Sequence, residues 1–282
     1  MISARGSAAG KQHDDVAADQ GEALSFDTNV AHLARVYDYW LGGKDNFAAD
    51  RLVGDQAIQA YPDIVFSVRA NRAFLARAVR FLAADAGIRQ FLDVGTGIPT
   101  AGSTHEVARS AAADCAVVYA DNDPVVLAHA RALLETAPAG LARYIHADLR
   151  DTEKVLAQAG QTLDFSQPVA VLLMAIMQHV GDEDDPAGIV ATLTDALPPG
   201  SYLVLSHLAG DLCGAPAIQI VQRLHQVMAQ RVTLRDRTEV IRLLSGLELV
   251  DPGLVRVQEW RPDTEAEATS PAAMWGAVAR KP

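Results

Sequence analysis

The chain has 282 residues, of which 50% are hydrophobic and 21% charged, and its net charge is −11. These values are typical of a globular enzyme with one large domain, or with one domain and a cap. The negative charge argues against nucleic acid or an anionic membrane surface as the main partner. No apolar run is long enough to span a bilayer and the N-terminus lacks a secretion-signal pattern, so we expect a cytoplasmic protein. Two cysteines, Cys115 and Cys213, provide neither a disulfide framework nor zinc spacing, and no metal site is expected.

The first 88 residues divide into a polar tail and a helical segment. Residues 1–24 are rich in Ala, Gly, Asp and Gln and lack apolar periodicity, which predicts a disordered tail. Residues 25–88 are predicted to form an N-terminal helical cap, and Asp27 or Asn29 is expected to cap its first helix. That helix is expected to run through residues 32–37, and two more are expected at 50–60 and 66–83, separated by a proline break.

Residues 37–47, with the sequence YDYWLGGKDNF, crowd aromatic rings, paired glycines and polar groups into a short stretch. One interpretation is a helix that ends at Gly42 and Gly43 with ordinary aromatic packing. The other is a lid over a ligand, because aromatic faces and a glycine hinge suit closure. The residue types leave both interpretations open.

Two arginines in the predicted helix 66–83 are candidates for binding an anion. Arg69 and Arg72 stand three residues apart and fall outside its apolar face. They either belong to a solvated face or together present a cationic patch to an anionic group.

From Arg89 onward, strand-like and helix-like segments alternate, which predicts an α/β fold with a parallel, doubly wound sheet. Residues 89–282 are therefore expected to form one domain. Strands are expected at 90–94, 115–120, 143–146, 169–174 and 201–206. Helices are expected at 104–112, 124–135, 152–158, 186–196, 217–231 and 237–245. Strand-like segments follow at 247–249, 255–257 and 274–278, and the two short ones suggest a terminal antiparallel hairpin at the sheet edge.

Ligands in doubly wound sheets bind beyond the carboxyl ends of the strands, and this chain places polar residues there. Gly95 and Gly97 follow the first strand and would let the backbone approach a ligand, with free N–H groups facing it. Asp121 ends the second strand, where its carboxylate could accept both hydroxyl groups of a ribose. Asp148 ends the third, where it could accept a hydrogen bond from an adenine amine.

The glycine turn distinguishes between adenosine cofactors. A dinucleotide site needs Gly-x-Gly-x-x-Gly, but Thr100 replaces the third glycine and Pro99 lacks an N–H group. Asp93, two residues before Gly95, would repel a pyrophosphate and attract an ammonium or sulfonium group. S-adenosylmethionine carries both cations and no phosphate, so it fits better than NAD.

Several stretches resemble a known family. DVGTG at 93–97, the acid at Asp121 and the pair Ala147–Asp148 resemble motifs of the class I S-adenosylmethionine-dependent methyltransferases. More narrowly, from about Phe26 to the C-terminus the chain resembles a bacterial family named S-adenosyl methyltransferase. The matching stretches are RVYDYWLGGKDNF (35–47), RANRAFL (69–75), QFLDVGTGIPT (90–100), YADNDP (119–124), YIHADLR (144–150) and LPPGSYLVLSH (197–207).

The resemblance implies a Rossmann-like, doubly wound sheet of seven strands that binds S-adenosylmethionine and releases S-adenosylhomocysteine. It favours the lid interpretation of residues 37–47. The cofactor-binding residues that it implies, together with those chosen from the strand ends, are Tyr37, Gly43, Lys44, Asn46, Arg72, Asp93, Gly95, Thr96, Gly97, Asp121, Asn122, Asp148, Leu149 and Met174.

The sequence names two candidate bases but no methyl acceptor. His179 and His207 end the fourth and fifth predicted strands, and each is either a base or a hydrogen-bonded structural histidine. Around His179 the chain has AIMQHV where the family resemblance leads us to expect Leu-His-Phe or Leu-His-His. We expect a methyltransferase for a small molecule, as a monomer or homodimer. The alternatives are a cofactor-binding protein with little or no catalysis and, more weakly, a nicotinamide oxidoreductase.

Overall fold

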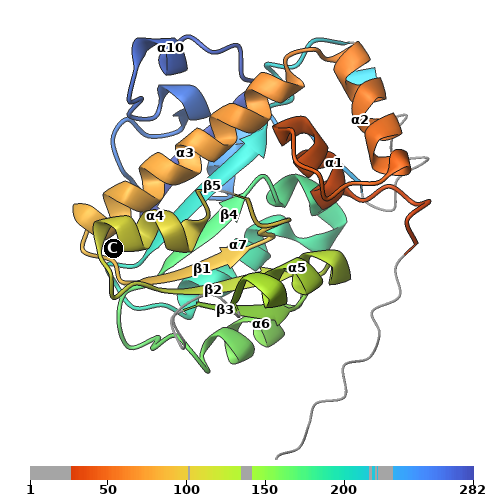
Figure 1. The fold of residues 1–282 in the computed structure, drawn as a ribbon. Coiled ribbons are helices and arrows are strands. Elements are labelled where there is room, and N and C mark those ends of the chain that lie inside the picture. Colours follow the sequence, from red (N-terminus) through yellow and green to blue (C-terminus); the bar gives the residue numbers. More distant parts are fainter. Residues whose placement is uncertain (1–26, 101, 135–141, 216–217, 220, 222–230) are drawn as a thin grey trace, which may run out of the picture.

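The computed structural model describes residues 27–100, 102–134, 142–215, 218–219, 221 and 231–282 (Figure 1). The tail expected at 1–24 and most of the helix expected at 217–231 lie outside these residues. No helix in the described part of the chain is both long and apolar enough to cross a membrane.

The centre of the fold is a mixed sheet whose strands follow the order β3-β2-β1-β4-β5-β8-β6. The first five strands are parallel to their neighbours, and β8 is antiparallel to β5. Their bounds are β1 Gln90–Val94, β2 Ala116–Asp121, β3 Ala142–His146, β4 Ala170–Met174, β5 Tyr202–Leu208 and β8 Met274–Arg280. The strand order reverses between β1 and β4. This is the Rossmann-like, doubly wound α/β arrangement that the sequence predicts.

The end of the chain differs from the expected hairpin. The short strands β6 (Glu248–Leu249) and β7 (Val255–Arg256) do not pair with each other. Both pair antiparallel with β8, at opposite ends of its free edge, because β5 occupies the other edge. The described sheet therefore has eight strands in seven lateral positions. The hairpin was wrong because short strands paired with a long third strand give the same local pattern.

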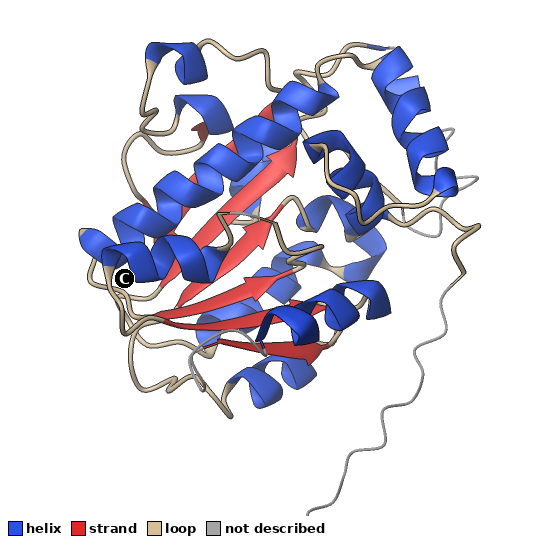
Figure 2. Cartoon of the chain, in the orientation of Figure 1, coloured by secondary structure: helices blue, strands red, loops and turns tan. Residues whose placement is uncertain are grey.

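Helices cover both faces of the sheet (Figures 1 and 2). One face packs against α3 (Ile64–Ala84) and α4 (Thr104–Ala111), and the other against α6 (Thr152–Ala159), α7 (Pro186–Asp195) and α9 (Arg237–Arg242). The helix α5 (Pro124–Leu134) contacts β2 and β3. Alternate strand residues separate into the two cores, as the period of two requires. Phe91 packs with α3, for example, and Leu92 with the opposite layer.

Short helical turns complete the described chain. They are η1 (Met177–His179), η2 (Asp182–Asp184), η3 (Val257–Glu259) and α10 (Glu265–Ala268). The turn η1 follows β4 directly, so its side chains lie at the carboxyl edge of the sheet.

The long helix α3 belongs to the layer that covers the sheet rather than to a separate cap. Phe74 and Leu75 pack in the same core as Phe91 of β1. Arg77, which is only 3% exposed, donates to the carbonyls of Val257 and Trp260 at 2.7 and 2.9 Å. Through α3, residues on both sides of position 88 share one core, and the expected division at residue 88 stays a prediction. The helices α1 and α2 together are called the cap below.

The helices α1 (Leu33–Leu41) and α2 (Ala48–Ala60) lie beyond the carboxyl ends of the parallel strands (Figure 1). They share a small core of Ala31, Val36 and Val53, which Trp40 connects to one of the two cores of the sheet. A fully buried carboxylate, Asp50, accepts from the backbone N–H groups of His32 and Phe47 at 2.9 and 2.8 Å. The cap is thus held together by its own apolar and polar contacts.

Candidate active site

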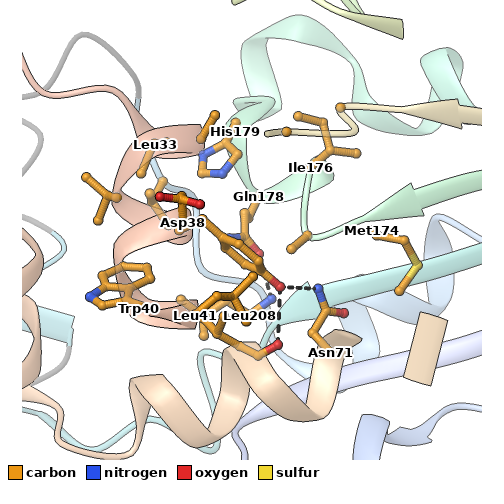
Figure 3. A pocket seen from close by; sticks show the side chains of 18 of the residues that line it. Leu33, Asp38, Trp40, Leu41, Asn71, Met174, Ile176, Gln178, His179 and Leu208 are labelled. Carbon is orange, nitrogen blue, oxygen red and sulfur yellow. Dashed lines mark hydrogen bonds between the residues drawn. The ribbon is translucent and has the colours of Figure 1, made fainter. Parts of the chain in front are cut away.

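A large cavity lies between the cap and the carboxyl edge of the sheet (Figure 3). It encloses about 1660 Å³, counting the open solvent at its mouth. The cavity reaches from the polar strand ends to the apolar inner side of the cap. Ten of the predicted site residues line it: Tyr37, Arg72, Asp93, Gly95, Thr96, Gly97, Asp121, Asn122, Met174 and His179.

At the floor of the cavity lies Asp93, which β1 delivers to the glycine turn. Its side chain is 4% exposed, and the Thr104 hydroxyl at the start of α4 donates to its Oδ2 at 2.6 Å. Burial raises the pKa of Asp93 to about 6, although the Thr104 hydrogen bond and the Arg72 charge act in the opposite direction. A buried carboxylate of this kind is stabilised by a cationic ligand group.

Residues 95–97 form a tight turn that leaves room for a ligand. Gly95 and Gly97 have φ of 72° and 66°, the left-handed region that glycine adopts without strain. A Cβ on Gly95 would come 2.4 Å from Ile176, whereas a Cβ on Gly97 would meet nothing within 4 Å. The open side of the turn is therefore at Gly97, on the cavity wall.

The N–H groups of Gly95 and Gly97, which the sequence predicts to be free, donate hydrogen bonds within the protein. The N–H of Gly95 donates to the Ala120 carbonyl at 2.8 Å, and the N–H of Gly97 donates to Asp121 Oδ2 at the same distance. The turn consequently provides close approach, but these two donors already serve the protein.

Asp121 at the end of β2 has both of its carboxylate oxygens in use. Oδ2 accepts from Gly97 and Oδ1 accepts from the N–H of Asp123 at 2.9 Å. Burial raises the pKa of Asp121. Each oxygen has a second lone pair, so the carboxylate can still accept hydroxyl groups from a ligand while it holds the turn.

Asp148 and Leu149 are not brought to the cavity. The Asp148 carboxylate, which is 37% exposed, accepts from Asn122 Nδ2 at 2.8 Å and from the N–H of Arg150 at 2.9 Å. The first of its contacts brings Asp148 next to Asn122, which does line the cavity. Leu149 packs in the sheet core below α6.

The shape of residues 37–47 depends on a buried residue, Asp38, that the sequence did not single out. Asp38 is 3% exposed, and its Oδ2 accepts from the N–H of Asp45 at 2.9 Å and from Asn46 Nδ2 at 2.8 Å. A Cβ on Gly43 would lie 1.9 Å from Asp38 Oδ1, so only glycine fits there. Gly43 and Asn46 thus shape the loop behind Asp38 without lining the cavity, and Lys44 is exposed on it.

Tyr37 is connected to the sheet by a chain of hydrogen bonds. Asn71 Nδ2 of α3 donates to the Tyr37 hydroxyl at 2.9 Å (Figure 3). The Ser206 hydroxyl of β5 donates to Asn71 Oδ1 at 2.6 Å and accepts from the N–H of Ala175 at 2.9 Å. Ala175 has φ of 53°, an uncommon conformation for a residue with a side chain. This relay joins the cap helix to the loop after β4.

The two arginines predicted to act together face different spaces. Arg72 lines the main cavity near Asp93, and its guanidinium donates to the Gly102 carbonyl at 3.1 Å. Arg69 lines a separate hollow between α3 and α10. A joint cationic patch was wrong, because Arg72 lines the cavity whereas Arg69 lines the hollow against α10.

The two histidines have different environments. His179 of η1 lines the cavity, and its Nδ1 lies 3.0 Å from the Arg231 carbonyl, so the ring donates from Nδ1 and keeps the Nε2 lone pair free. Burial lowers its pKa to about 4, which makes the ring neutral at pH 7. His207 is fully buried: it donates from Nδ1 to the Leu208 carbonyl, while Arg235 donates to Nε2 at 3.1 Å. The structure does not bring His207 to the cavity.

Much of the cavity wall is apolar and comes from elements that the sequence did not connect with the site. These residues belong to α1, α2, α3, β5 and the segments after β5: Leu33, Trp40, Leu41, Val53, Tyr61, Ile64, Leu208, Val232, Leu234 and Met274. Only the aromatic crowding of residues 37–47 indicated part of this wall. Gln178, also missed, lines the cavity while its Oε1 accepts from the N–H of Leu208 at 2.9 Å.

Comparison with known proteins identifies the family. A family described as S-adenosyl methyltransferase matches residues 19–282. The chain belongs to this family. It is a class I S-adenosylmethionine-dependent methyltransferase, as the family and the fold together show. No curated protein matches the sequence.

Solved structures agree with the family. A DUF574 family protein from Streptomyces avermitilis is 44% identical, with a TM-score of 0.86 over 91% of this chain and 99% of that one. A candidate methyltransferase from Thermobifida fusca is 38% identical, with a TM-score of 0.84 over 90% and 96% of the two chains. An O-methyltransferase family protein from Burkholderia thailandensis, 14% identical with a TM-score of 0.51 over 81% and 62%, shares the fold.

The described residues fit the cofactor of this family. Asp93 offers a buried negative charge and Arg72 a positive one within the same cavity, which suits the ammonium and carboxylate of a methionyl group. The open space at Gly97 lies beside Asp121, as close packing of a ribose requires.

Proposed function

We propose that this methyltransferase binds S-adenosylmethionine along the edge formed by Asp93, residues 95–97 and Asp121, and methylates a small molecule held in the apolar part of the cavity. The observation that supports this most is the division of one cavity into a charged part at the strand ends and an apolar part beneath the cap. Two ligands of different chemistry can then meet within one enclosed space.

In this proposal the protein contributes binding and alignment. S-adenosylmethionine supplies a methyl carbon that positive sulfur already activates, so proximity and orientation carry most of the acceleration. Asp93 would bind the ammonium group and Arg72 the carboxylate. Asp121 would accept from the ribose, Met174 would pack beside it, and Asn122 with its partner Asp148 would border the adenine. The demethylated product would be S-adenosylhomocysteine.

His179 is the proposed base for an acceptor that must lose a proton. Its ring is neutral at pH 7 and offers Nε2 as the proton acceptor, since Nδ1 donates to the Arg231 carbonyl. A pKa near 4 makes it a weak base, so its contribution depends on the acidity of the acceptor. His207 has no such role, because both of its ring nitrogens are engaged in the core.

The experiment that tests this function is calorimetry of the purified protein with S-adenosylmethionine, S-adenosylhomocysteine and NAD, followed by a methyl-acceptor screen that detects S-adenosylhomocysteine. We expect micromolar binding of the first two ligands and turnover with an apolar acceptor. Binding of NAD alone would refute the proposal. Tight cofactor binding without turnover across a broad acceptor library would instead favour a binding protein with little catalysis.

A further inference from the structure

One oxygen of Asp38 has no use within the protein. Oδ2 of this carboxylate accepts hydrogen bonds from Asp45 and Asn46, but Oδ1 has no hydrogen-bond partner among the described residues. The side chain is 3% exposed and lines the cavity. No described cation forms an ion pair with it. Because the side chain lines the cavity and Oδ1 is not sealed off by protein atoms, a ligand in the cavity can donate to this oxygen.

The neighbouring polar groups point to the same kind of ligand. His179 keeps the Nε2 lone pair, which also needs a donor. Asp38, Gln178 and His179 all line the cavity, where Figure 3 labels them. Around them the wall is apolar, with the rings of Trp40 and Tyr61 among its members. The site thus combines hydrogen-bond acceptors with an apolar enclosure.

The charged residues that line the cavity indicate whether a neutral, cationic or anionic ligand would bind there. Among its described lining residues, Asp38, Asp93 and Asp121 carry carboxylates and Arg72 carries the guanidinium. In the proposed function, Asp93 and Arg72 are matched by the ammonium and carboxylate of the cofactor, and Asp121 accepts hydrogen bonds from its ribose. The Asp38 charge, on the cap side, is then left without a partner. An anionic acceptor would be repelled, whereas an amine would be attracted.

We propose that Asp38 is the residue that recognises the methyl acceptor, and that the acceptor is an apolar molecule with an amino group that donates to Asp38 Oδ1. This inference rests on the proposed function. Gly43 is needed for this position of Asp38, because any side chain at residue 43 would occupy the place of the Asp38 carboxylate. The amino group anchors the acceptor, and the apolar wall selects for the rest of it.

The test uses three probes that share one ring and differ in the polar group: 2-phenylethylamine, 2-phenylethanol and phenylacetate. Each is titrated into the full-length protein saturated with S-adenosylhomocysteine, and binding is followed by saturation-transfer NMR. We expect the amine to bind about tenfold or more tightly than the alcohol, and phenylacetate to bind least, because a hydrogen bond between charged groups is stronger than one to a neutral donor.

The variant Asp38→Asn keeps the shape of the side chain and removes its charge. It should abolish the preference for the amine and leave binding of the alcohol within about twofold. The matched control is Asp45→Asn, which removes a carboxylate of the same loop that is 46% exposed and does not line the cavity. The control should keep the preference.

Three outcomes would overturn the inference: equal binding of amine and alcohol to the wild-type protein, absence of binding by all three probes, or a large loss of S-adenosylhomocysteine affinity in Asp38→Asn. The last would assign Asp38 to the cofactor. If Asp38→Asn fails to fold, the wild-type order of the probes decides alone. Failure of the proposed function is distinguishable, because the wild-type protein would then bind no S-adenosylhomocysteine.

Discussion

At the scale of single residues, the buried negative charge of Asp93 lowers the stability of the folded protein. The folded pKa of about 6 lies above the ordinary value of 3.8. Between these values the folded protein holds more protons than the unfolded chain, so stability falls as pH rises from about 4 to 6 and does not return at pH 7. The shift corresponds to about 3 kcal/mol at pH 7. A ligand cation would recover part of it.

We therefore expect Asp93→Asn to stabilise the ligand-free protein at pH 7, by about 1–3 kcal/mol, and to do so less at pH 5. The same change should weaken binding of S-adenosylmethionine. Urea denaturation at both pH values and calorimetry measure the two effects. A variant that is less stable at pH 7 and binds the cofactor normally would contradict this account of Asp93.

Asp121 gives a second prediction at this scale. Asp121→Ala removes the acceptor for the N–H of Gly97 as well as the proposed ribose contact. We expect cofactor binding to weaken by about 1–3 kcal/mol, the scale of a lost hydrogen bond to a buried charge. Calorimetry with S-adenosylhomocysteine measures it, and Asp114→Asn on the exposed surface serves as control. An unchanged dissociation constant would remove Asp121 from the site.

The sequence could predict those site residues that end a strand, and few others. Asp93, Gly97 and Asp121 follow from the strand pattern alone, because the carboxyl ends of parallel strands meet at one edge. Asp38 and Asn71 could not be found this way, since each reaches the cavity through the packing of a helix. His207 was misjudged because the alternation of β5 turns it away from Asn71, the partner of Ser206.

At the scale of elements, the relay through Tyr37, Asn71 and Ser206 joins α1, α3 and β5. Asn71 and Ser206 are buried, Tyr37 lines the cavity, and each hydrogen bond orders the next. Networks of this kind are coupled, so removal of one member changes the contribution of another. The relay thereby fixes where α1 stands relative to the loop after β4.

The coupling is measurable by a double-mutant cycle of Tyr37→Phe and Asn71→Ala in urea denaturation. We expect each single change to cost about 1–3 kcal/mol and the pair to couple by about 0.5–2 kcal/mol. Tyr39→Phe is the matched control on the same helix, because its hydroxyl donates to Asp55 at the exposed surface. Strictly additive effects of Tyr37 and Asn71 would show that the relay is not a unit.

Element prediction succeeded where periodicity was strong. The parallel strands and their helices lie close to the predicted ranges, because buried runs such as 170–174 admit few alternatives. The terminal segments were harder, since strands of two residues carry too few side chains to define a partner. The pairing of β6 and β7 with β8 depends on contacts across the sheet that no local pattern contains.

At the scale of the whole molecule, the chain has one large framework and one small cap. The sheet and its layers hold two extensive cores, whereas α1 and α2 bury only a few apolar side chains between them. Regions with few buried contacts open at lower free energy than the rest of a protein. Whether the chain divides into two domains at residue 88 remains a proposal.

Hydrogen exchange should therefore show faster exchange in α1 and α2 than in β1 and β4 without ligand. S-adenosylhomocysteine should slow exchange in α1, because residues of this helix line the cavity. Mass spectrometry of peptides that cover residues 30–60, 88–96 and 168–176 measures both effects. Equal protection of cap and sheet in the free protein would contradict a separately opening cap.

The cap is a segment with a small core of its own, which has a consequence for engineering. Such a segment can be exchanged between homologous enzymes if the recipient keeps Asn71, the partner of Tyr37, and the core residues against which Trp40 packs. Replacing residues 30–60 with those of a homologue would transplant Asp38, Trp40 and part of the apolar wall while leaving the strand ends untouched. The methyl donor would stay the same, and the range of molecules that receive its methyl group would travel with the transplanted segment.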